Sequence, residues 1–182
     1  MNKILPFFFF LLFFTEEEPK PEQYIARLGQ VSFFSYTSVE NIEAKNNQVL
    51  SILDVSKNEI AISMLMRGFV FKKSLMHEHF NESYIESDIY PKATFKGSIV
   101  DFDATSKETQ TRMIVGDLSI HGITKKAEIK TTIEYINGGY VLVGAFSVSI
   151  KSFDIRVPPI LASNIAKNIS IKFRFEYNRY EE

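Results

Sequence analysis

The chain has 182 residues, 45% of them hydrophobic, and a formal net charge of −1 at pH 7. This length fits one domain with a core of its own, and the sequence holds no cysteine that could add a disulfide. Because the net charge is close to zero and Lys and Arg are scattered, the composition argues against a nucleic-acid-binding protein.

The first fifteen residues differ from the rest of the chain. Lys3 gives a positive start, and an apolar run over 4–14 follows that only Pro6 interrupts. Such a run is shorter than the about 20 residues of a membrane-spanning helix, but it fits the apolar region of a secretory signal. We therefore predict a signal peptide at 1–15, a polar spacer at 16–22 and a folded domain at 23–180. The mature protein would be periplasmic or secreted, with no stable transmembrane span. An uncleaved N-terminal anchor is the alternative, because no A-x-A cleavage pattern follows the run.

Alternation of apolar and polar residues dominates the remainder and predicts β-strands. The pattern places strands at 30–37, 48–53, 59–67, 93–103, 109–120, 126–135, 140–150 and 169–178. Asn137-Gly138 between two of these strands predicts a tight hairpin, since both residues adopt positive φ readily. The last strand alternates most clearly, with one apolar face made of Ile169, Ile171, Phe173, Phe175 and Tyr177. About eight strands at hairpin spacing favour a sandwich or a barrel.

Two stretches interrupt this β pattern. Leu75, Met76, His79 and Phe80 recur at helical spacing and predict a short helix over 72–81. Pro158 and Pro159 predict a short helical turn near 159–166.

Catalytic motifs are absent from the sequence. It has no thiol, no nucleophile elbow, no phosphate-binding glycine loop and no zinc-protease motif. The three histidines are His77, His79 and His121, and a metal site needs three or four convergent ligands. We expect hydrogen-bonded, partly buried histidines, and we predict no enzyme activity, no metal and no cofactor.

Soft apolar residues gather in the middle of the chain. The group comprises Met64, Leu65, Met66, Phe69, Phe71, Leu75, Met76 and Phe80. A filled core is one interpretation. A cavity lining is the other, because Met and Phe adapt to flexible apolar ligands. An eight-stranded barrel permits both, since its interior is either just filled by side chains or holds one small ligand.

Four segments resemble, in order and spacing, the YceI-like family of exported β-barrel proteins. They are 69–84 (FVFKKSLMHEHFNESY), 90–97 (YPKATFKG), 115–125 (VGDLSIHGITK) and 152–155 (SFDI), the last followed by Pro158. The resemblance runs over about 24–177. It implies an all-β fold, an eight-stranded antiparallel lipocalin-like barrel with one short helix as a lid.

The resemblance also implies a function. Some members of that family are similar to polyisoprenoid-binding proteins, in which an isoprenoid tail threads the barrel. We therefore predict an exported carrier of an apolar molecule: an isoprenoid quinone, a polyprenyl phosphate or a fatty acyl lipid. The predicted ligand-binding residues are Met64, Met66, Phe69, Phe71, Leu75, Met76, Phe80, Phe95, Phe146 and Phe153.

Three basic residues, Lys72, Lys73 and Arg156, flank apolar stretches and are candidates for contact with a ligand head group. A homodimer is a possible assembly. The alternative function is a structural or stress-related interaction protein whose barrel is filled by its own side chains and holds no ligand.

Overall fold

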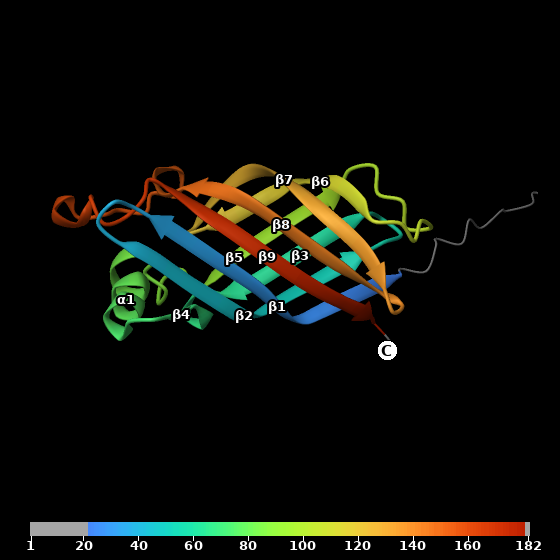
Figure 1. Ribbon diagram of the computed structural model, residues 1–182, viewed down its shortest axis with the longest axis horizontal. Helices are drawn as coiled ribbons and strands as arrows, with labels where there is room; N and C mark the ends of the chain where they lie inside the picture. The colour runs from blue at the N-terminus through green and yellow to red at the C-terminus, as the bar shows by residue number, and fades with distance from the viewer. Residues whose placement is uncertain (1–21, 181–182) are drawn as a thin grey trace, which may run out of the picture.

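Nine antiparallel strands account for most of the chain in the computed structural model, which describes residues 22–180 (Figure 1). The predicted signal at 1–15 and almost all of the spacer at 16–22 lie outside these residues. The strands are β1 (Gln23–Tyr36), β2 (Asn41–Asp54), β3 (Glu59–Leu65), β4 (Val70–Phe71), β5 (Lys92–Ile99), β6 (Gln110–Ile120), β7 (Ile123–Ile136), β8 (Gly139–Ser149) and β9 (Asn168–Arg179).

Eight of the strands form a closed ring, which confirms the predicted barrel. The order around the ring is β1-β9-β8-β7-β6-β5-β3-β2, and pairing of β1 with β2 closes it. The two-residue β4 follows β3 along the chain and pairs with Ala44 and Lys45 of β2. β7 and β8 pair only next to their turn, where residues 131–136 of β7 lie opposite residues 139–144 of β8. The remaining parts of the two strands, residues 123–130 and 145–149, are not paired with each other.

The first two strands are longer than their alternation predicts. β1 begins at Gln23 rather than at residue 30, and β2 begins at Asn41 rather than at residue 48. The register between the two strands shifts between Ala26 and Val31, which marks β-bulges. A bulge places two consecutive residues against one, so the period of two breaks there and hides the start of the strand.

Two tight turns depend on residues with positive φ. Asn137 and Gly138 have φ of 52° and 83° and connect β7 to β8, so the predicted hairpin is confirmed. His121 and Gly122 have φ of 51° and 73° and connect β6 to β7 in the same way. Both pairs fit the mirror-image turns whose twist matches that of paired strands.

The helical segments gather at one end of the barrel (Figure 1). Helix α1 (Ser74–His79) continues directly into a π-helical turn, η2 (Phe80–Tyr84), so the helix predicted at 72–81 is present and shifted toward the C-terminus. The turn predicted near 159–166 contains the short 3-10 helix η4 (Pro159–Leu161). Two further 3-10 helices are η1 (Met66–Gly68) and η3 (Ile150–Phe153). Within residues 22–180, every helix is too short or too polar to cross a bilayer.

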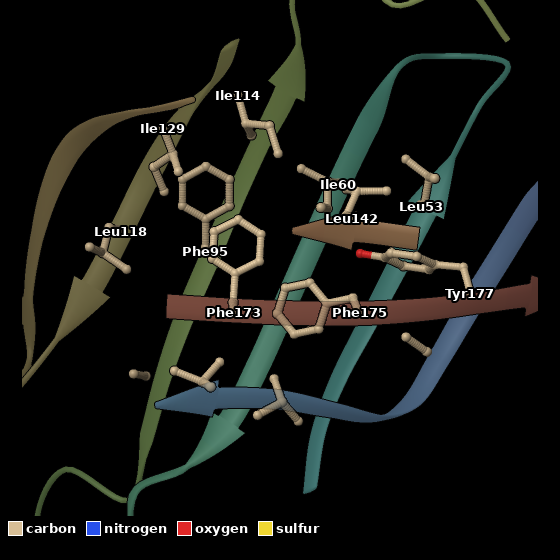
Figure 2. Packing of buried hydrophobic residues seen from close by; sticks show 14 of the residues in the cluster. Leu53, Ile60, Phe95, Ile114, Leu118, Ile129, Leu142, Phe173, Phe175 and Tyr177 are labelled. Atoms are coloured by element: carbon tan, nitrogen blue, oxygen red, sulfur yellow. The ribbon is translucent and has the colours of Figure 1, made fainter. Parts of the chain in front are cut away.

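Side chains fill the barrel interior away from this helical end. The largest fully buried residues there include Leu53, Ile114, Ile133, Leu142, Phe175 and Tyr177, several of which Figure 2 shows converging. The phenol of Tyr177 lies 2.6 Å from the Ser51 hydroxyl, and burial raises the pKa of that phenol. This half of the barrel is therefore a solid core whose buried polar pair is satisfied.

Candidate ligand site at the helical end of the barrel

An apolar cavity of about 200 Å³ lies at the helical end of the barrel. Strand residues on its wall point inward from β1, β2, β3, β5, β6, β8 and β9, and the rest come from β4, the helical segments and the adjoining loops. The apolar and aromatic lining residues are Val31, Phe33, Ile42, Met64, Met66, Phe69, Phe71, Met76, Phe80, Tyr84, Ile85, Ala93, Ile120, Val148, Ile150, Ile155, Val157, Leu161, Ile165, Ile169 and Ile171. Such a lining provides affinity through burial of apolar surface rather than through polar contacts.

Four phenylalanines form one wall of the cavity. Phe33 of β1 stacks on Phe80 of η2 with ring centroids 5.4 Å apart. Phe69 and Phe71 contact both of these rings at centroid distances from 5.1 to 5.7 Å. These contacts hold the α1–η2 segment against the barrel and make it part of the cavity wall.

Hydrogen bonds fix the orientation of α1. The Nδ1 atom of His77 lies 2.9 Å from the Phe69 carbonyl oxygen, and Asn81 donates its Nδ2 proton to the His77 carbonyl at 2.8 Å. Met76 then faces the cavity, whereas Leu75 is 58% exposed. Adjacent residues on a helix point in directions about 100° apart, which explains this difference.

Few polar groups reach the cavity. They come from Ser35, Glu40, His79, Tyr84 and Asn164. A hydrogen bond from Lys73 at 2.8 Å lowers the pKa of the Glu40 carboxyl, and burial raises the pKa of the Tyr84 phenol. The Ser35 hydroxyl is engaged, since it accepts the Ala166 N–H at 2.8 Å. None of the lining residues is a Lys or an Arg.

The ten residues predicted to bind ligand fall into two groups. Six line the cavity: Met64, Met66, Phe69, Phe71, Met76 and Phe80. Four do not, and they are Leu75, Phe95, Phe146 and Phe153. Leu75 is on the outer side of α1, while Phe95 and Phe153 are buried in the core. Phe146 is partly buried and contacts Phe173 edge to face.

The three predicted head-group residues are exposed and paired with carboxylates. Lys72 lies 3.7 Å from Glu43, Lys73 lies 2.8 Å from Glu40, and Arg156 lies 3.3 Å from Asp154. Of the carboxylate partners, only Glu40 lines the cavity. Exposed pairs of this kind contribute about 0–1 kcal/mol each, so they orient side chains more than they stabilise the fold.

Sequence reasoning missed about three quarters of the lining, since only six of its 25 residues were predicted. Phe33, Ile120, Val148, Ile169 and Ile171 all lie on inward faces of strands. The alternation identified these faces without showing which positions reach a cavity. Ile155, Val157, Leu161 and Ile165 come from the irregular segment after η3, and no periodic pattern marks them.

Two of the three histidines, His77 and His121, make hydrogen bonds through their rings. The His121 side chain is 8% exposed, with Nε2 3.0 Å from Glu86 Oε2 and Nδ1 3.0 Å from the Phe153 carbonyl oxygen. His79 lies at the cavity. Across residues 22–180, no three His, Cys, Asp or Glu side chains converge in a way that could hold a metal ion.

Comparisons with known proteins agree with this architecture. The family model of the YceI-like domain matches residues 27–177. A polyisoprenoid-binding domain from Saccharophagus degradans, implicated in plant cell wall breakdown, is similar in structure with a TM-score of 0.75 and 10% identity, over 88% of this chain and 100% of that one. Burkholderia cenocepacia BcnA is similar with a TM-score of 0.69 and 16% identity, over 82% and 96% of the two chains. The YceI protein of Campylobacter jejuni gives a TM-score of 0.55 at 10% identity over both whole chains. No curated protein matches the sequence. At these identities the structural likeness establishes the fold alone.

Proposed function

The chain belongs to the YceI-like domain family, and from this premise we propose that it binds a lipid or isoprenoid in the cavity at the helical end of its barrel. The observation that carries the proposal is the cavity itself, lined by Met, Phe and aliphatic side chains. The description of a structural relative as a polyisoprenoid-binding domain supports the same class of ligand. The proposed role is binding or carriage, without catalysis.

The affinity for such a ligand would come from its apolar part. Each buried methylene contributes about 0.8 kcal/mol. An exposed ion pair to a head group adds about 0–1 kcal/mol. The tail would therefore set the affinity, and the head group would set the orientation.

We further infer that the bound molecule has an uncharged head group. Glu40 lines the cavity, and it is paired with Lys73, one of the three candidate head-group residues. A phosphate at this place would have to compete with the Glu40 carboxylate for Lys73. Among the expected ligands, this favours an isoprenoid quinone over a polyprenyl phosphate.

Export to the periplasm or beyond is part of the proposal. The apolar run at 4–14 after Lys3 supports it. N-terminal sequencing of the protein from fractionated cells of its own host is expected to give a start close to Thr15. A soluble cytoplasmic pool with Met1 intact would overturn this part.

The second candidate is a structural or interaction protein without a ligand. The solid core at one end of the barrel favours it, and so does the cavity volume of about 200 Å³. Sites for drug-sized ligands usually enclose about 300–1,000 Å³. The two candidate functions differ in whether the purified protein carries a bound apolar molecule.

Native mass spectrometry of protein purified from its own host, followed by organic extraction, tests the choice. We expect one apolar molecule per chain. Met76→Arg places a charge in the cavity and is expected to abolish this binding while the fold survives. Leu75→Arg is the matched control on the exposed side of the same helix and is expected to retain the ligand. Protein that is empty from its own host, and that takes up no lipid or isoprenoid in vitro, would support the structural candidate.

A further inference from the structure

We propose that four inward-facing side chains close the cavity partway along the barrel. They limit the enclosed part of the ligand to about eight carbons, an estimate that follows from the cavity volume. The inference rests on the proposed function and specifies the ligand further. We call the four side chains the floor. They are Phe95 of β5, Leu118 of β6, Phe146 of β8 and Phe173 of β9.

On four strands the lining ends one inward position before a floor residue. Its last residues there are Ala93, Ile120, Val148 and Ile171. Because side chains alternate along a strand, the next inward position lies two residues further into the barrel. On each strand that position holds a floor residue, and none of the four floor residues lines the cavity.

The floor spans the cross-section of the barrel. Phe95 lies opposite Leu118 in the β5–β6 register, and Phe173 contacts Phe146 edge to face with ring centroids 6.5 Å apart. Strands β5 and β9 are four positions apart in the ring of eight, so Phe95 and Phe173 enter from opposite walls. Figure 2 shows both rings in the same part of the interior, and both belong to the buried core cluster.

The space beneath the floor is occupied. Phe173 stacks on Phe175 with centroids 5.2 Å apart and an interplanar angle of 21°. Phe175 is almost completely buried in the solid half of the barrel. Gly144 leaves room for the Phe173 ring, since a Cβ atom there would lie 2.5 Å from Phe173 Cζ. The ring therefore has a fitted place against the β8 backbone, and a longer ligand finds no space below it.

The cavity volume sets the length of chain that can be enclosed. An apolar cavity of about 150 Å³ is large enough for benzene. The cavity here is about 200 Å³, which corresponds to a ligand segment somewhat larger than benzene. Scaling the six carbons of benzene by the ratio of the two volumes gives about eight carbons, between one and two isoprene units. Carbons beyond that number would remain outside the mouth and add little affinity.

A series of neutral prenyl alcohols measures this limit directly. Prenol, geraniol, farnesol and geranylgeraniol lengthen the chain by one isoprene unit at a time, and calorimetry on ligand-free mature protein gives their affinities. Each carbon that becomes buried is expected to raise the affinity by about fourfold. We expect this rise from prenol to geraniol, and affinities within about threefold of one another from geraniol to geranylgeraniol.

Three variants on β9 distinguish a specific effect of the floor on ligand length from a general effect of looser core packing. Phe173→Leu lowers the floor and is expected to bind farnesol about tenfold more tightly than the wild type does. Phe175→Leu is the matched control, one inward position deeper, and is expected to keep the wild-type limit. Ile171→Phe raises the floor and is expected to weaken geraniol more than prenol. Ile171→Phe also tests the floor if Phe173→Leu unfolds at too low a temperature for its ligand affinity to be measured.

A wild-type affinity that keeps rising about fourfold per carbon up to geranylgeraniol would overturn the floor. An equal shift in Phe173→Leu and Phe175→Leu would do the same. Either result would leave the proposed function standing, because binding would still occur. If the folded wild type binds none of the alcohols, both the floor and the proposed function are wrong.

Discussion

Leucine substitutions at two buried alanines test whether one end of the barrel is hollow and the other is filled. Ala93 of β5 lines the cavity, opposite Met64 in the β3–β5 register. Ala26 of β1 lies outside the cavity lining, opposite the buried Ser51 of β2. Each alanine is only 1% exposed, so burial alone does not distinguish them. Replacing each by Leu adds the same three carbons to the interior.

The two substitutions are expected to change stability in opposite directions. In the cavity, the added carbons gain about 0.8 kcal/mol each, and fixing the leucine rotamer costs about 0.5–1 kcal/mol. The free energy of unfolding of Ala93→Leu should therefore rise by about 1–2 kcal/mol. That corresponds to about 2–8 °C in Tm for a domain of this size. At Ala26, overpacking should lower the free energy of unfolding by about 1–3 kcal/mol.

Urea unfolding of ligand-free protein, followed by circular dichroism, measures both changes. The wild type is the reference, and an unchanged m-value shows that the free energies are comparable. If Ala93→Leu loses as much stability as Ala26→Leu, the space beside Ala93 is already filled, and the cavity argument fails. Ala93→Leu should also bind geraniol more weakly, because it occupies the ligand's volume.

Three further predictions concern the frame of the barrel. Burial of Asp54 opposes its ionisation, but hydrogen bonds from the following turn hold the pKa of its carboxyl below the ordinary value. The stability this provides is present above the ordinary carboxyl pKa and is lost as pH falls through the lowered value, so urea unfolding of Asp54→Asn should depend less on pH in that acidic range. Tyr177→Phe should lower the free energy of unfolding by about 1–3 kcal/mol, because a buried hydrogen bond is lost. A cost near zero would mean that this bond contributes nothing. Gly122→Ala should lower Tm more than Gly138→Ala, since both have positive φ but only at Gly122 would the new Cβ approach a neighbour, Tyr90 at 2.7 Å. Equal melting shifts would refute that argument.

Local patterns in the sequence are enough to predict most of the strands and the faces that they bury. Alternation on the last strand assigned Ile171, Phe173 and Phe175 to one inward face, and the barrel places them there. Asn137-Gly138 fixed one hairpin, because its turn needs positive φ at two adjacent positions. Both signals are local, so they can be read without knowing what lies across the barrel. The bulges of β1 and β2 broke the alternation, and there the strand boundaries were missed.

Where the barrel interior is hollow depends on packing between strands that are distant in sequence. Ile171 and Phe173 share one strand and one face, yet the first lines the cavity and the second closes it. The difference depends on what enters from the opposite wall at the same level, which is Phe95 for Phe173. On α1 the sequence grouped Leu75 with Met76, and the docking of the helix turned only Met76 inward. Alternation specifies the direction of a side chain, whereas a cavity depends on how chains distant in sequence fill the same volume.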